Sequence, residues 1–94
     1  MQLPLTFLYD GKEERGTVLN LSLQGCALTA DNTPAVSTYL SLQIELAEGT
    51  APIAIELAGI RWVAGRRCGL EFIRISPEMM AGLRDFVALL ETTP

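Results

Sequence analysis

The sequence predicts an all-β protein, a small antiparallel barrel or sandwich of six strands followed by one C-terminal α-helix. Three observations indicate this architecture. Short apolar or alternating segments recur along most of the chain, and residues typical of turns separate them. The periodicity changes to that of a helix in the last segment. The length of 94 residues suits a single core, so we expect one domain over residues 1–94.

The first two strands are expected at residues 3–9 and 12–20. The segment LPLTFLY is apolar and aromatic, and Pro4 lies near its start, where an edge position tolerates a missing N–H group. Asp10 and Gly11 then form a dipeptide typical of a tight turn. We therefore predict that these two strands pair as a hairpin.

Four further strands are expected at residues 26–30, 39–46, 53–64 and 68–73. The segment YLSLQIEL alternates between apolar and polar residues, which is typical of a strand with one buried face. Gly59 lies in the middle of the long segment 53–64, and an internal glycine favours a bulge or bend that lets a sheet close on itself. The apolar face of 39–46 comprises Leu40, Leu42, Ile44 and Leu46.

Residues 77–91 are predicted to form the helix. Ser76 is a candidate N-cap, and Pro77 suits the first helical position. Ile75 and Met80 have the spacing of a hydrophobic staple. The helix carries one apolar stripe, which either packs on the body of the domain or forms the seam of a homodimer. This stripe comprises Met79, Met80, Leu83, Phe86, Val87 and Leu90.

Composition and charge argue against several functional classes. The net charge of −4 disfavours a binder of DNA or RNA polymers, whose affinity comes largely from neutralising phosphates. Histidine, the commonest general base and metal ligand, is absent, and we find no phosphate loop, nucleophile elbow or metal-type cluster. We therefore expect no enzyme activity, cofactor or bound metal. No apolar run reaches the roughly 18 residues of a membrane span.

The two cysteines and the start of the chain indicate a cytoplasmic location. Cys26 and Cys68 are far apart in the sequence and lie inside apolar segments, so we expect reduced, buried thiols. The first apolar stretch has no basic segment before it, unlike a secretory signal.

The segment Asn20-Leu21-Ser22-Leu23-Gln24-Gly25 is the strongest candidate for a binding site. The Asn20 amide holds a donor and an acceptor side by side, the Ser22 hydroxyl follows two residues later, and Gly25 lets a ligand approach the backbone. This set suits the edge of a purine base. The alternative is a turn whose side chains bond only to their own backbone.

The segment NLSLQG fits the [D/N]-x-S-x-x-G motif of PilZ domains, which are cytosolic bacterial receptors for cyclic di-GMP. GTVLNLSLQGCAL resembles the motif-bearing part of that family, AGIRWV its long later strand, GLEF its last strand and the tail its helix. The resemblance implies a six-stranded antiparallel barrel and a signalling role. It also implies that Asn20, Ser22 and Gly25 contact guanine and nearby groups of the ligand.

Two neighbouring residues extend the predicted ligand site. Trp62 resembles an aromatic residue that some family members place beside the ligand, the alternative being a core or rim aromatic. Arg61 faces the same surface as Ser22 if the bend at Gly59 reorients it.

The sequence departs from the family at its start. Cyclic di-GMP binders of the family carry an Arg-x-x-x-Arg element just before the first strand, and here this element would lie upstream of Met1. The segment 12–15, KEER, only superficially resembles it, because it lies in the hairpin and carries two carboxylates. Either the chain is trimmed from a longer protein, or its pocket is half built and binds weakly or not at all.

Two functions therefore stay open. The first is a non-catalytic receptor for cyclic di-GMP that transmits ligand occupancy to a neighbouring domain or protein. The second is a degenerate adaptor that acts through protein contacts and does not bind the nucleotide.

Overall fold

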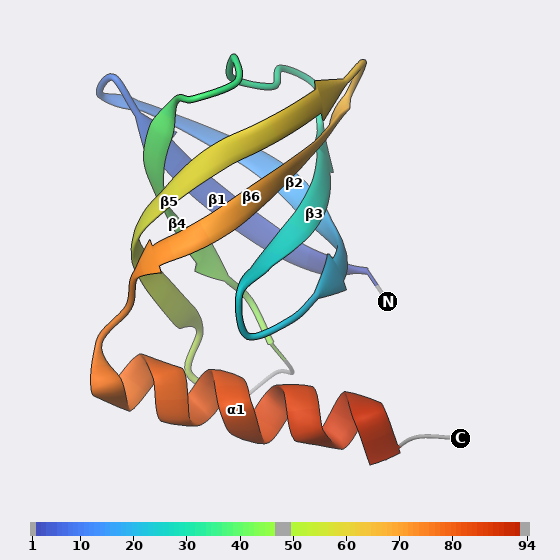
Figure 1. Cartoon of the computed structure of the whole chain (residues 1–94), viewed down its shortest axis with the longest axis vertical. Coiled ribbons are helices and arrows are strands. Elements are labelled where there is room, and N and C mark those ends of the chain that lie inside the picture. The colour runs from blue at the N-terminus through green and yellow to red at the C-terminus, as the bar shows by residue number, and fades with distance from the viewer. Residues whose placement is uncertain (1, 47–49, 93–94) are drawn as a thin grey trace.

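The computed structural model describes residues 2–46 and 50–92 and confirms the predicted fold class. It is a closed, antiparallel six-stranded barrel with one C-terminal helix that lies across one end of the barrel (Figure 1). The elements are β1 (Leu3–Tyr9), β2 (Lys12–Leu21), β3 (Gly25–Ala30), β4 (Tyr39–Ile44), β5 (Ile53–Ala64), β6 (Arg67–Arg74) and α1 (Pro77–Thr92).

The strand order around the barrel is β1-β2-β3-β6-β5-β4, and pairing of β1 with β4 closes it. The predicted hairpin of β1 and β2 is confirmed, with Tyr9 opposite Lys12. Asp10 and Gly11 both have positive φ, 50° and 71°, as the tight hairpin turn requires. Closure leaves no open sheet edge among the six strands, since each pairs on both sides.

The fourth strand is shorter than predicted. It ends at Ile44 and not at Leu46, because Ile44 already lies opposite Ile53, the first residue of β5. Leu40, Leu42 and Ile44 are buried as expected. β1 and β5 have the predicted bounds, and the remaining elements differ by one residue at one or both ends: β2 extends to Leu21, β3 begins at Gly25, β6 spans Arg67–Arg74 and α1 extends to Thr92.

Four register shifts in the sheet alter which side chains face outward. The predicted irregularity of β5 is confirmed, because its register with β6 shifts between Leu57 and Ala58 and again between Ile60 and Trp62. Two further shifts lie in the pairing of β2 with β3, between Val18 and Asn20, and in that of β4 with β5, between Leu40 and Leu42. An extra residue in a strand exchanges the two faces for every residue beyond it. The bulges therefore decide what lies on the outer surface.

The helix is capped and packed as the sequence predicts. The Met79 N–H donates to Ser76 Oγ at 3.2 Å, which confirms the N-cap. Leu83 and Val87 of the apolar stripe are buried against the barrel. The stripe therefore packs on the body of the domain, and the homodimer stays a prediction.

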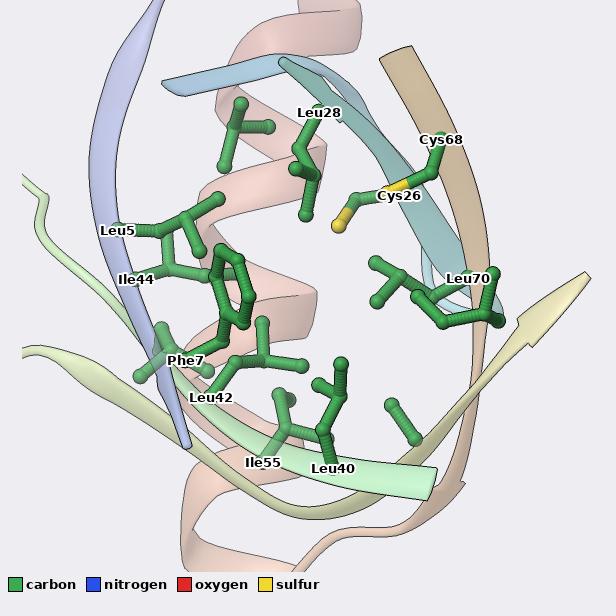
Figure 2. Close-up of a cluster of buried hydrophobic side chains, with 14 of the residues drawn as sticks. Leu5, Phe7, Cys26, Leu28, Leu40, Leu42, Ile44, Ile55, Cys68 and Leu70 are labelled. Carbon is green, nitrogen blue, oxygen red and sulfur yellow. The ribbon is translucent and has the colours of Figure 1, made fainter. Parts of the chain in front are cut away.

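The barrel interior is filled with apolar side chains (Figure 2). Phe7, Leu28 and Ile55, from three different strands, are each at most 2% exposed. Cys26 and Cys68 are free, buried thiols within this cluster, as predicted. Among the described residues no polar or charged residue is buried in this core, so the polar side chains lie nearer the surface.

The buried thiols predict a loss of stability at alkaline pH. Burial raises the pKa of Cys26 from 9.0 to about 12, with a further contribution from Cys68, and burial raises that of Cys68 from 9.0 to about 11. Above pH 9 the unfolded chain loses protons that the folded barrel retains. The buried thiols favour the folded state while they stay protonated, and their contribution to the free energy of unfolding is fully present below pH 9. This contribution should be lost as pH rises from about 9 to about 12.

Urea denaturation of wild type and of Cys26→Ala at a series of pH values tests this expectation. The Cys26→Ala variant should lose less stability than wild type between pH 8 and about 11. An equal loss in both proteins would show that Cys26 does not contribute to the pH dependence.

Candidate functional site

The outer face of β2, β3, β6 and β5 carries a row of residues that crosses all four strands. Asn20 pairs with Ala27, Ala27 with Gly69, and Gly69 with Trp62. Bulges at both ends of the row make this arrangement possible. Because Leu19 is the extra residue in β2 and Arg61 in β5, Asn20 and Trp62 face outward instead of into the barrel.

This row forms a pocket, the motif pocket, of about 410 Å³. The two small residues Ala27 and Gly69 lie between the larger Asn20 and Trp62, so the surface is hollowed there. The structure brings together all five residues that the sequence singled out. The polar and aromatic lining of the motif pocket comprises Asn20, Ser22, Gln24, Arg61, Trp62 and Glu71, and its backbone lining includes Gly25.

Ser22 organises the turn between β2 and β3. Its hydroxyl accepts hydrogen bonds from the N–H groups of Gln24 at 3.2 Å and Gly25 at 3.3 Å, and it lies 3.3 Å from the Gly25 carbonyl, to which it donates. The Ser22 N–H also donates to this carbonyl at 2.9 Å. The Ser22 hydroxyl therefore makes its hydrogen bonds to the backbone of its own turn, as in the alternative given above.

Asn20 differs from Ser22. Its side chain is exposed, and no hydrogen bond of its amide occurs within the described part of the chain. The amide therefore has both its donor and its acceptor available to a ligand in the motif pocket.

Gly25 allows β3 to lie against β6 at the edge of the motif pocket. A Cβ atom at this position would lie 2.0 Å from the Leu70 carbonyl oxygen, closer than any real contact. The Gln24 carbonyl accepts a 2.7 Å hydrogen bond from the Phe72 N–H, which fixes the turn on β6. Glycine at this position is thus needed for strand packing, independently of any ligand.

Trp62 forms one wall of the motif pocket and is 45% exposed. Its indole ring lies against the backbone of Gly69, where an added Cβ would be 2.1 Å from the indole Nε1. The residue is therefore a rim aromatic that rests on a neighbouring strand and keeps much of its surface open. Such a side chain can stack on a planar base.

Arg61 lies in the motif pocket but is held there by an acidic partner. Its Nη2 donates to Glu71 Oε1, and both side chains are about half exposed. Sequence reasoning missed Glu71, Ala27 and Gly69 as pocket residues. The alternation of CGLEFI indicates that Gly69 and Glu71 share a face, but only the bulged register places that face beside Asn20.

The described residues contain no cluster of histidine, cysteine, aspartate or glutamate that would hold a metal ion. The one helix among them is too short or too polar to cross a membrane. The groups that the motif pocket offers are the Asn20 amide, the exposed Trp62 ring and the ion pair of Arg61 with Glu71.

The closed six-stranded barrel with a helix across its end, and the pocket built on an Asn-x-Ser-x-x-Gly turn, are the arrangement that the resemblance in the sequence implies. A family model for the PilZ domain matches residues 1–89, and the chain belongs to the PilZ family. Domains of this family are typically non-catalytic receptor modules in cyclic di-GMP signalling. No curated protein shows a significant match.

Proposed function

We propose that this domain is a non-catalytic receptor that binds cyclic di-GMP in the motif pocket, in the cytoplasm of a bacterium. One observation carries the proposal. Four strands and two bulges bring Asn20, Arg61 and Trp62 to one hollow beside the motif turn, and all of them are exposed.

Each residue has a distinct role in this proposal. The Asn20 amide bonds to the donor and acceptor edge of a guanine, and Trp62 stacks on its face. Arg61 forms a bidentate contact with a phosphate once it leaves Glu71. Ser22 and Gly25 act by shaping the turn, so that Asn20 is held at its rim.

The motif turn also lies close to α1, which gives ligand occupancy a route to other parts of the protein (Figure 1). A groove of about 520 Å³ between them is lined by Leu21 and Leu23 of the turn region and by Val87 and Leu90 of the helix. A ligand that tightens the turn would change this packing. We propose that a neighbouring domain or protein reads the change at the helix.

The adaptor that does not bind nucleotide is the second candidate, and one observation favours it. The Ser22 hydroxyl is used by its own turn, and Arg61 is neutralised by Glu71. The motif pocket then presents no free positive charge to a ligand with two phosphates. An adaptor would keep the barrel and the helix surface and would tolerate loss of the Asn20 amide.

Calorimetric titration with cyclic di-GMP distinguishes the two functions. Two proteins are compared, this chain and the same chain preceded by an Arg-x-x-x-Arg segment. Leu3 lies opposite Val18, close to the end of β2 that carries Asn20, so such a segment would enter beside the motif pocket. Binding that Asn20→Ala abolishes supports the receptor. Absence of binding in both proteins favours the adaptor.

Substitution of Glu71 is expected to strengthen the binding of cyclic di-GMP, whereas substitution of Asn20 abolishes it. Glu71→Gln removes a negative charge from the motif pocket and releases Arg61 toward a phosphate. Because an exposed ion pair is worth about 0.2–1 kcal/mol, we expect cyclic di-GMP to bind roughly 2- to 5-fold more tightly. Glu78→Gln, an exposed first-turn helix residue outside the motif pocket, is the matched control. Weaker binding by Glu71→Gln alone would show that Glu71 contacts the ligand directly.

A further inference from the structure

A second pocket, the arginine pocket, lies on the same outer face, toward the other end of β2 and β3. It has a volume of about 290 Å³. Its polar lining consists of Arg15, Thr17, Thr29, Asp31 and Arg66. Nothing in the motif or in the proposed function so far uses these residues.

The strand register holds this lining in place. Thr17 lies directly opposite Thr29 in the pairing of β2 with β3, so their side chains are neighbours on the outer face. The Ala30 N–H donates to the Arg66 carbonyl at 2.9 Å, which fixes the β5–β6 turn beside the end of β3. The Arg66 side chain therefore extends from a turn whose backbone is hydrogen-bonded to β3.

The arginine pocket begins one row of side chains away from the floor of the motif pocket. Thr29 follows Ala27 by two residues in β3, and Arg67, opposite Thr29, precedes Gly69 by two residues in β6. Two residues of a strand span about 6.6–6.8 Å, and they face the same side. One nucleotide bound in the motif pocket can therefore reach the arginine pocket with its phosphate.

Basic residues are concentrated on this face, although the protein as a whole is acidic. The chain has seven basic residues and a net charge of −4. Four of the seven lie on or beside this face: Arg15, Arg61, Arg66 and Arg67. Within the described residues only Arg61 of these four forms an ion pair, so the other three guanidinium groups are available to an anion.

We propose that the arginine pocket binds a phosphate of the nucleotide whose base lies in the motif pocket. This inference rests on the proposed function. The guanidinium groups of Arg15 and Arg66 donate to the phosphate oxygens, and the hydroxyls of Thr17 and Thr29 add neutral donors. Asp31 opposes the anion, which lowers the affinity for free phosphate and favours a phosphate tethered to a bound base.

Charge substitutions of equal size test the proposal by titration with cyclic di-GMP. Arg15→Gln and Arg66→Gln should each weaken binding roughly 10-fold, the loss of one charge-assisted contact. Asp31→Asn should tighten it by roughly 2- to 3-fold. Arg84→Gln, an exposed residue of α1 outside both pockets, is the control and should change the affinity little.

Amide chemical shifts give a second readout that does not depend on the variants. Cyclic di-GMP should shift the Thr17 and Thr29 resonances together with that of Asn20, whereas guanosine, which has no phosphate, should shift only the Asn20 region. Inorganic phosphate alone should leave all three unchanged.

The possible failures can be told apart. If neither this chain nor the chain preceded by an Arg-x-x-x-Arg segment binds cyclic di-GMP, the proposed function fails, and the phosphate site fails with it. If only the extended chain binds, the substitutions are compared in that chain. If wild type binds but Arg15→Gln and Arg66→Gln match Arg84→Gln, only the arginine pocket is refuted. Shifts of Thr17 and Thr29 with inorganic phosphate but not with cyclic di-GMP would also refute it, because the site would then be independent of the nucleotide.

Discussion

Gly25→Ala is expected to destabilise the barrel by about 3 kcal/mol or more. The added Cβ would meet the Leu70 carbonyl oxygen at 2.0 Å. A backbone atom in a paired strand cannot rotate away, as the end of a side chain can. Relief therefore requires that β3 moves off β6, which breaks the pairing of Gly25 with Glu71.

Thermal denaturation followed by circular dichroism measures this effect. For a domain of this size, we expect the midpoint of Gly25→Ala to fall by roughly 15 °C. Gly82→Ala is the matched control, because its Cβ would meet only the flexible end of Ile53 at 3.2 Å and alanine favours a helix by about 1 kcal/mol. A Gly25→Ala midpoint within a few degrees of wild type would show that β3 can shift freely.

Most of the fold can be predicted from the sequence, because the patterns that indicate it are local. Alternation places Leu40, Leu42 and Ile44 inward, a dipeptide closes the first hairpin, and Ser76 caps the helix. Each signal depends on residues within a few positions of one another. The end of β4 at Ile44 differs from the prediction because it depends on the register in which β4 pairs with β5, and a local pattern does not contain that register.

The site is less accessible to sequence reasoning, because it depends on bulges. Gly59 indicates an irregularity in β5, yet the residue that reorients Trp62 is Arg61, and the bulge at Leu19 has no comparable signal. The neighbourhood of Arg61 and Glu71 follows from the shifted register of β5 and β6. The motif in the sequence therefore identifies the turn, whereas the strand register determines which residues of β5 and β6 lie beside it.

Gly69→Ala is expected to weaken binding of cyclic di-GMP without a large loss of stability. The new methyl group would lie 2.1 Å from the indole Nε1 of Trp62. Because Trp62 is 45% exposed, its ring can swing into solvent, unlike the backbone beside Gly25. The stacking surface is then lost, and since stacking on one base is worth about 1–3 kcal/mol, binding should weaken roughly 5- to 150-fold.

A double-mutant cycle attributes this loss to the ring. Trp62→Ala alone should weaken binding as much as Gly69→Ala, and the double variant should lose no more than either, because both changes remove the same surface. Trp62→Phe keeps a ring and should retain most of the affinity. Trp62 is the only tryptophan, so its fluorescence reports the displacement directly. If Gly69→Ala shifts this fluorescence while the affinity stays at the wild-type value, Trp62 is a structural rim residue and the base stacks elsewhere.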